Sequence, residues 1–271
     1  MKILAAMFTR RWLLATFVVA AGMVLCIRLG IWQLDRLEKR RAFNARVQEQ
    51  IELPALELSG EALNSDLYNM EYREVEAAGR YDFDNQVAIR NQSWSNEPGV
   101  HLLTPLILEG TGTAVLVDRG WIPSQDFETG DWSQFNEPGL VKVKGILRRS
   151  QSKAELGGRS DTVPAPGEAP LKAWIFVNID GISQQLPYPV LPAYLQQAPD
   201  KSWTNLPYRS QPKLELTEGP HQSYAIQWFT FATLLGVGYP FFIRKQHKRS
   251  QIDPDQSNVN GASKERTFHH A

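Results

Sequence analysis

Hydrophobic residues gather in two long runs near the ends of the chain. Residues 12–32 read WLLATFVVAAGMVLCIRLGIW, and residues 223–243 read SYAIQWFTFATLLGVGYPFFI. A helix rises about 1.5 Å per residue, so each run is roughly as long as the hydrocarbon core of a bilayer is thick. The pattern predicts two membrane-spanning helices.

The first run has an alternative interpretation as a cleaved signal peptide. Lys2, Arg10 and Arg11 would form the basic region with which such peptides begin. The apolar run is too long for a typical signal peptide, however, and no A-x-A site closes it. We therefore expect an uncleaved anchor.

The charges that flank the two runs give opposite indications of orientation. Basic residues follow the second run and place the C-terminus in the cytoplasm: Arg244, Lys245, Lys248 and Arg249. Basic residues also follow the first run and point the other way: Arg36, Lys39, Arg40 and Arg41. Charges that lead into a long domain have less weight, so the second run decides and both termini are expected in the cytoplasm.

The predicted organisation has five segments. Residues 1–11 form a cytoplasmic N-terminus, 12–34 and 221–243 two transmembrane helices, 35–220 an extracytoplasmic domain, and 244–271 a basic cytoplasmic flank with a disordered tail. The chain begins without a long presequence rich in Arg and Ser. The expected location is the bacterial cytoplasmic membrane, which the chain crosses twice, with its central domain in the periplasm.

The central segment alternates short hydrophobic runs with turn-forming residues. After a charged helix at residues 35–52, the runs are YREVEAAGRYD, QVAIRNQ, HLLTPLIL, TAVLVDRGWIP, LVKVKGILRR and AWIFVNID. Helical spacing is nearly absent among them, so they predict an antiparallel β-rich domain, barrel- or sandwich-like. The predicted fold class is a membrane protein in which two transmembrane α-helices bracket this extracytoplasmic domain.

Composition and motifs narrow the class of function. The formal net charge of +0 gives no overall positive field for a nucleic-acid partner. The one cysteine, Cys26, can form neither an internal disulfide nor a thiolate zinc site. The central segment holds no Gly-rich phosphate loop, H-E-x-x-H or G-x-S-x-G motif, and His101 is typical of a satisfied strand residue. A membrane-anchored hydrolase would need a nucleophile and base that we cannot place, so we expect no enzymatic activity.

Polar and aromatic side chains collect where both helices meet the outer interface. Helical spacing places three on one face of each helix: Arg28, Trp32 and Arg36 on the first, and His221, Tyr224 and Trp228 on the second. Rows of small residues favour close helix packing: Gly22, Cys26 and Gly30 in the first helix, and Ala232 and Gly236 in the second. An aromatic belt would explain the tryptophans alone. A pocket for a flat anionic cofactor such as haem would also explain the imidazole and the guanidinium groups.

Five stretches stand out along the chain: LGIWQLDR at residues 29–36, RYD after Gly79, TPL at 104–106, VLVDRGWIP at 115–123, and HQSYAIQWFTFA at the head of the second run. In this order they resemble the marks of the SURF1 family. The resemblance implies two helices that bracket a β-rich outer domain, in the orientation chosen above. It also implies a membrane protein that assists assembly of haem-copper cytochrome c oxidase, near haem a insertion into the catalytic subunit.

The resemblance also implies site residues at the helix ends and on one strand. His221 matches the family histidine that heads the second span, and is the candidate ligand of haem iron. The other matched positions are Gly30, Trp32, Gln33 and Arg36 in the first motif, Tyr224, Gln227 and Trp228 in the second, and Arg119, Gly120 and Trp121 in the strand motif. Two departures are Asp118, where Asn is common in the family, and Gln222, where Leu often stands. The strand motif has a structural interpretation too, with Trp121 packing in the mouth of the β domain.

Two mechanisms stay open under this resemblance. In the first, the protein is a haem-handling chaperone for haem a, with contacts from His221, Tyr224, Trp228, Trp32, Arg28 and Arg36. In the second, it is a haem-free adaptor that holds an oxidase subunit or a haem-synthesis enzyme such as haem a synthase. The expected partners are the catalytic subunit of the oxidase and membrane lipid, with no nucleic acid.

Overall fold

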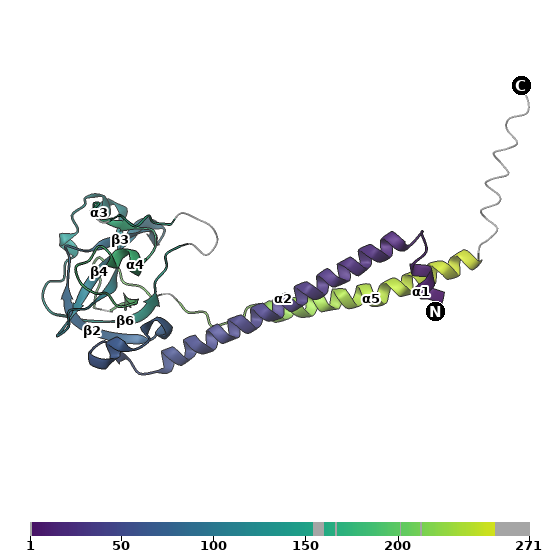
Figure 1. Cartoon of the computed structure of the whole chain (residues 1–271), viewed down its shortest axis with the longest axis horizontal. Helices are drawn as coiled ribbons and strands as arrows, with labels where there is room; N and C mark the ends of the chain where they lie inside the picture. Colours follow the sequence, from purple (N-terminus) through teal and green to yellow (C-terminus); the bar gives the residue numbers. More distant parts are fainter. Residues whose placement is uncertain (1, 154–159, 166, 201, 212, 253–271) are drawn as a thin grey trace, which may run out of the picture. The chain divides into compact units, whose positions relative to one another are not determined.

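The computed structural model describes residues 2–153, 160–165, 167–200, 202–211 and 213–252 (Figure 1). The chain divides into two compact units. One unit holds the residues up to Asn44 together with those from Leu216 onward, and the other is Ala45–Glu215. Most of the predicted tail, residues 253–271, lies outside the described residues.

The first unit is built from helices. α1 (Lys2–Met7) precedes α2 (Leu13–Glu52), and α5 (His221–Ile252) runs beside α2 (Figure 1). Both long helices are apolar enough and long enough to cross a membrane, by length and composition. α2 is one continuous helix of 40 residues, where the sequence pattern separated a span from a charged helix. The helix continues because no glycine or proline occurs between residues 31 and 52.

A polar contact joins the two long helices near the start of α2. The Oγ1 atom of Thr16 in α2 and the hydroxyl of Tyr239 in α5 lie 2.7 Å apart. Both side chains are part-buried. A hydrogen bond in apolar surroundings has little competition from water, so this pair helps to set the register of the helices.

The second unit is built on one eight-stranded sheet. Its strands are β1 (Leu56–Glu57), β2 (Glu74–Tyr81), β3 (Val87–Trp94), β4 (Glu97–Leu108), β5 (Ala114–Pro123), β6 (Val141–Arg149), β7 (Ala173–Trp174) and β8 (Ala193–Gln197). The strand order is β1-β2-β6-β8-β5-β4-β3-β7, with an additional pairing of β2 with β4. Short helical segments connect them: η1 (Gly60–Asn64), η2 (Leu67–Met70), α3 (Ser124–Glu128), η3 (Ser133–Phe135) and α4 (Ile179–Ser183).

The sheet is mixed, so the prediction of an antiparallel barrel- or sandwich-like domain is wrong. The pairs β1–β2, β3–β7 and β5–β8 are parallel. β1 has only two residues, which is too short for a visible alternation in the sequence. Of the predicted run AWIFVNID, only Ala173–Trp174 forms a strand, and its last two residues begin α4. The long hydrophobic runs do pair antiparallel, as β2–β6, β2–β4, β3–β4 and β4–β5.

The hydrophobic core surrounds β5. All residues of β5 from Ala114 to Ile122 are buried, because both faces of this strand are covered. Leu106, Val117 and Leu195 belong to the largest cluster of buried side chains. Polar residues within β5 are therefore held deep inside the unit.

A β-bulge in β5 changes the direction of its polar side chains. Gly120 pairs with Leu102 and Asp118 with Leu103, so Arg119 is the extra residue. A bulge breaks the regular alternation of a strand and re-aims side chains near it. Asp118 and Arg119 consequently enter two different polar networks.

Candidate functional site

The long helices of the first unit approach each other through buried small residues. Gly30 and Cys26 of α2 are buried, as are Ala225 and Ala232 of α5. A Cβ atom built on Gly30 would lie 2.8 Å from the ring of Phe229, so this approach needs glycine. The close packing brings the part of α2 that follows Gly30 within reach of the first turn of α5.

His221 is the first residue of α5, and it is hydrogen-bonded to Gln33 of α2. Its Nδ1 atom lies 2.9 Å from Oε1 of the Gln33 amide. An amide oxygen only accepts, so Nδ1 donates here and Nε2 is the ring nitrogen left for another contact. Gln33 is 9% exposed, so water competes little for this bond. The contact fixes both the tautomer and the orientation of the imidazole.

The Nε2 atom of His221 lies on the side of the turn before α5. Gly219 in this turn has a φ of 68°, which favours glycine. A Cβ atom built on Gly219 would lie 3.8 Å from Nε2 of His221. The missing side chain therefore leaves room beside the ring nitrogen.

A cavity of about 460 Å³ opens beside this turn. It is lined by Arg36, Lys39, Arg40 and Phe43 from α2, and by Thr217, Glu218, Gly219 and His221 from the start of α5. The lining holds three cationic side chains and one carboxylate, that of Glu218. Both oxygens of Glu218 are bound by Arg41, at 2.7 and 2.8 Å. Lys39 forms an exposed pair with Asp35 at 2.8 Å. An oxyanion beside the imidazole would meet mainly positive charge.

Hydrogen bonds tie the segment before α5 to α2. Arg40 Nε donates to the carbonyl of Thr217 at 3.0 Å, and Asn44 Nδ2 donates to that of Leu216 at 3.1 Å. The hydrogen bond from Arg41 lowers the pKa of Glu218, desolvation opposes this effect, and the charge of Arg41 reinforces it. The carboxylate stays ionised, and the walls of the cavity are held together.

The structure brings some of the predicted cofactor contacts into this cavity. Arg36 and His221 both line it. The guanidinium of Arg36 also lies 5.9 Å from the ring centroid of Trp32, which is 51% exposed. Tyr224 is 46% exposed, and the ring of Trp228 contacts Phe231 edge-on.

The remaining predicted residues lie on other faces of the helices. Arg28 and Trp32 follow the buried Cys26 and Gly30 by two positions, which is about 200° around a helix. Arg28 is exposed, and within the described part of the chain no hydrogen bond or ion pair reaches it. Gln227 is exposed as well. The stripe of α2 that faces α5 passes through Gln33 rather than Trp32.

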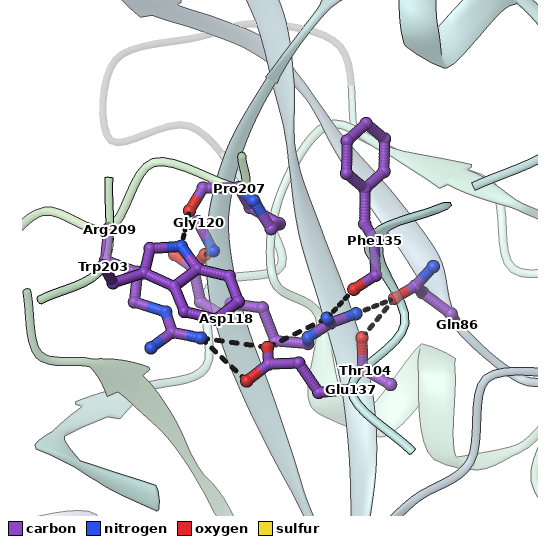
Figure 2. Close-up of polar contacts among 10 residues, drawn as sticks. Gln86, Thr104, Asp118, Gly120, Phe135, Glu137, Trp203, Pro207 and Arg209 are labelled. Atoms are coloured by element: carbon purple, nitrogen blue, oxygen red, sulfur yellow. Dashed lines mark hydrogen bonds and ion pairs between the residues drawn. The ribbon is translucent and has the colours of Figure 1, made fainter. Parts of the chain in front are cut away.

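Arg119, from the strand motif, is fully buried in a polar network of the second unit. It donates to Oε1 of Gln86 at 2.9 Å, to Oε1 of Glu137 at 3.0 Å and to the carbonyl of Phe135. Figure 2 labels these three partners. Arg209 binds the same Glu137 carboxylate at 2.9 and 3.0 Å. The network joins β5 to segments that are far apart in the sequence.

Two aromatic rings complete the enclosure of Arg119. Its guanidinium lies 5.0 Å from the ring centroid of Tyr81 and 5.2 Å from that of Phe83. Burial raises the pKa of Tyr81, against the opposing effect of Arg119. Tyr81 is therefore neutral at physiological pH, and the cation stays paired with Glu137.

Gly120 and Trp121 dock a later segment of the chain onto β5. Gly120 has a φ of 122°, and a Cβ atom built there would lie 2.5 Å from the carbonyl oxygen of Tyr208. Trp121 and Tyr208 exchange two backbone hydrogen bonds, at 2.9 and 2.8 Å. Their rings stack with a centroid distance of 6.0 Å. These contacts favour the structural interpretation of the strand motif.

His101 of β4 has a partner that the sequence reasoning missed. Its Nδ1 atom lies 3.0 and 2.9 Å from the two carboxylate oxygens of Asp118. Burial lowers the pKa of His101, but the charge and hydrogen bond of Asp118 outweigh it, so the pKa lies above its ordinary value. The hairpin pattern of the sequence places the two strands side by side. The bulge at Arg119, which sets the side chains in contact, leaves no sequence signal.

Lys39, Arg40 and Gly219 were also missed as lining residues. Lys39 and Arg40 follow Arg36 at the i+3 and i+4 positions of the same helix, which is the signal that could have found them. Gly219, two residues before the histidine, is a typical turn residue.

A family model and several relatives found by comparison with known proteins all point to the same family. The SURF1 family model matches residues 20–233. The chain is 26% identical over 262 residues to a SURF1-like protein of Rickettsia bellii, covering 93% of this chain and 100% of the relative. It is 23% identical over 221 residues to a SURF1-like protein of Caenorhabditis briggsae, covering 74% and 67%. It is 21% identical over 216 residues to Surfeit locus protein 1 of Rattus norvegicus, covering 74% and 66%. Because the family match spans most of α2, the whole sheet and the first part of α5, the chain belongs to the SURF1 family.

Proposed function

We propose that this protein is an assembly factor for haem-copper cytochrome c oxidase, and that it assists insertion of haem a into the catalytic subunit. Membership of the SURF1 family, which is known for oxidase assembly, supports the first part of this proposal. The second part rests on one observation. His221 is held by Gln33 through Nδ1, beside a cavity lined by cationic side chains.

The residues around this cavity fit a haem group by the chemistry of their donors. Within the described residues, no group of three or more His, Cys, Asp or Glu side chains could hold a bare metal ion. Haem iron is already held by its macrocycle, so one imidazole suffices. A neutral ring with its proton on Nδ1 presents Nε2 as that ligand. Arg36, Lys39 and Arg40 would neutralise propionate groups.

The residues around the cavity have separate roles in this proposal. Haem a, when bound, supplies an iron centre that accepts an imidazole ligand. Gln33 orients His221, and Gly219 keeps the space beside Nε2 open. Arg36 binds a propionate from the α2 side. The exposed Trp32 and Tyr224 stay predicted contacts, together with Trp228 and Arg28, on surfaces that a lipid or the catalytic subunit can cover.

The proposed location is the bacterial cytoplasmic membrane. The two long apolar helices and the match to a Rickettsia relative support a membrane protein of bacterial type. We propose that both helices span the bilayer and that the sheet domain lies in the periplasm, as expected from the charges behind the second span. In this arrangement, the proposed partners are the oxidase catalytic subunit, haem a synthase and membrane lipid, and the protein acts without enzymatic turnover.

Absorption spectroscopy of the protein purified from cells that make haem a tests the proposal. We expect a Soret band in the wild type and its loss in His221→Ala, which should still fold but melt at a slightly lower temperature because the buried Gln33 loses its hydrogen-bond partner. His101→Gln is a matched histidine control in the other unit and should keep its haem. A colourless wild type would favour the alternative, a haem-free adaptor that holds an oxidase subunit or haem a synthase.

A further inference from the structure

A second cavity lies within the sheet unit and is not used by the proposed function. Its volume is about 670 Å³, which is within the range of roughly 300–1,000 Å³ that small-molecule sites occupy. Its walls come from β3, β4, β5, β6 and β8, and from the segment after β7. Its size and polar walls suit a small polar molecule.

The pair of His101 and Asp118 forms one wall of this cavity. Nδ1 of His101 donates to the Asp118 carboxylate, whose oxygens lie 3.0 and 2.9 Å away. Oδ1 of Asp118 also accepts the backbone N–H of Gly120 at 3.1 Å. The acceptor capacity of Asp118 is thus engaged, while no hydrogen bond within the described residues reaches Nε2 of His101. The imidazole therefore has a donor to offer whenever it is charged.

Two arginines bring further positive charge to the same walls. Arg148 has a buried Nε atom that makes no hydrogen bond within the described residues, and its distance to Glu71 is 3.7 Å. Arg90 lies 3.8 Å from Asp161. Neither Glu71 nor Asp161 lines the cavity, and Asp161 already accepts two backbone N–H groups, at 2.7 and 3.2 Å. Both arginines line the cavity, and each also forms a loose ion pair with a carboxylate that lies outside the lining.

Irregularities in two strands shape this cavity. β3 has a register shift between Ile89 and Gln92, and Asn91 there has a φ of 61°. β5 has the bulge at Arg119 that turns Asp118 toward His101. Bulges of this kind are frequent beside binding sites, where they re-aim side chains.

We propose that this cavity binds a small oxyanion, held by Nε2 of His101 and by the guanidinium groups of Arg148 and Arg90. Charge-assisted hydrogen bonds from imidazolium and arginine are the usual recognition of carboxylate and phosphate. The ligand is either a free organic acid or inorganic phosphate, and these two sources can be distinguished by titration. The site is in the other unit from His221, so it stands independently of the proposed haem chemistry.

Binding should depend on the protonation of His101 alone near neutral pH. The charged and titratable groups around it are Arg90 of β3, Asp118 of β5, Arg148 of β6 and Tyr194 of β8. Burial raises the pKa of Tyr194, so its hydroxyl stays neutral. The affinity for an oxyanion should therefore fall as the pH rises through the raised pKa of His101.

Calorimetric titration of the detergent-purified full chain with succinate and with inorganic phosphate tests this site. At about pH 6.5 we expect saturable binding of at least one anion, weakened about tenfold in His101→Gln and in Arg148→Gln because each removes a charge-assisted hydrogen bond. Arg80→Gln is the matched control, since Arg80 is exposed on β2 outside the cavity. Binding of succinate alone identifies a carboxylate ligand, and binding of phosphate alone identifies phosphate.

The wild-type pH profile keeps the test decisive if a variant fails to fold. The carboxylates of succinate are largely ionised between about pH 6.5 and 8.5, so a fall in its affinity over that range reports His101. Where phosphate is the ligand, its negative charge grows as the pH rises, which by itself favours binding. A fall in phosphate affinity over the same range therefore also reports His101. The absence of saturable binding in the wild type, a flat profile, or equal affinities in the folded variants and the wild type would overturn the proposal.

Discussion

Nδ1 of His221 donates a hydrogen bond to Oε1 of Gln33 across the interface of α5 and α2, over 2.9 Å. The bond links a residue at the start of one helix to a residue 188 positions earlier in the chain. A buried acceptor of this kind fixes which ring nitrogen is available to a ligand. The function proposed for His221 therefore depends on Gln33 as well.

Replacing Gln33 by leucine tests this dependence. Leucine has a similar size and packs in the apolar interface, but it cannot accept the Nδ1 proton. Loss of a partner that orients a metal-bound histidine typically lowers metal affinity about 10–100-fold, and we expect a loss of that order in a haem titration. Gln227→Leu makes the same chemical change at an exposed position of α5 and should leave haem affinity unchanged. Equal haem affinity in both variants would show that Gln33 does not support haem binding at His221.

Gly30→Ala should weaken the pairing of the helices. The added Cβ atom would lie 2.8 Å from two ring carbons of Phe229, so the helices or the ring must move. Such overpacking typically costs about 1–3 kcal/mol, which thermal unfolding in detergent can detect. Gly22→Ala is the control, because its Cβ atom would meet only Leu235, at an ordinary 3.6 Å. Identical melting of both variants would show that the ring adapts without cost.

Arg119→Ala should destabilise the fold rather than impair a surface function. The change leaves Glu137 facing Arg209 alone and leaves Gln86 without its cationic donor. Removing one member of a buried charged network typically costs about 3–5 kcal/mol. Arg80→Ala removes an exposed arginine of the same unit and should melt like the wild type. Oxidase assembly lost in an Arg119→Ala protein of normal stability would argue for a direct functional role.

The stability of the protein should decrease as the pH rises above neutrality, through His101. The charge and hydrogen bond of Asp118 raise the pKa of His101 in the folded state, despite burial. A raised pKa contributes stability that is complete below the ordinary histidine value of about 6.5 and is lost as the pH rises through the folded value. Denaturant unfolding at a series of pH values measures this slope. His101→Gln should flatten it, and an unchanged slope in that variant would assign the pH dependence to other groups.

Reporter fusions test the proposed orientation. A reporter that is active only in the periplasm should be active when fused after Ser160 and inactive when fused after Ser257. The physical reason is the group of basic residues behind the second span, which favours the cytoplasmic side. The opposite pattern would place the His221 cavity on the cytoplasmic side of the membrane.

Much of the sheet could be predicted because its long strands alternate or run continuously in hydrophobic residues. β2 to β6 lie on predicted runs, and β5 is buried over nearly its whole length. β8 was missed because AYLQQ is short and partly polar, although Leu195 packs in the largest hydrophobic cluster. Its parallel pairing with β5 depends on the path of the intervening chain, which local patterns do not encode.

The sequence indicates at which helix ends the candidate site lies, but it does not indicate which face of each helix the site uses. His221 stands out as a histidine at the head of an apolar run, and Gly30 as a small residue at helical spacing. The choice between Trp32 and Gln33 as the inward residue depends on helix rotation, which Phe229 sets by packing on Gly30. The partnership of His101 and Asp118 depends on one extra residue in β5. Neither feature leaves a periodic pattern in the sequence.

The contact between Thr16 and Tyr239 has a consequence at the opposite end of the helix pair. Together with the bond from His221 to Gln33, it joins α5 to α2 at two points that are roughly 27 Å apart along the helix, at about 1.5 Å per residue. Sliding α5 by even one residue would break both bonds at once. The imidazole is thus held at a fixed position along the helix axes relative to the apolar part of α2. Any molecule that delivers a ligand to this histidine, or receives one from it, has to reach that same position along the helix axes.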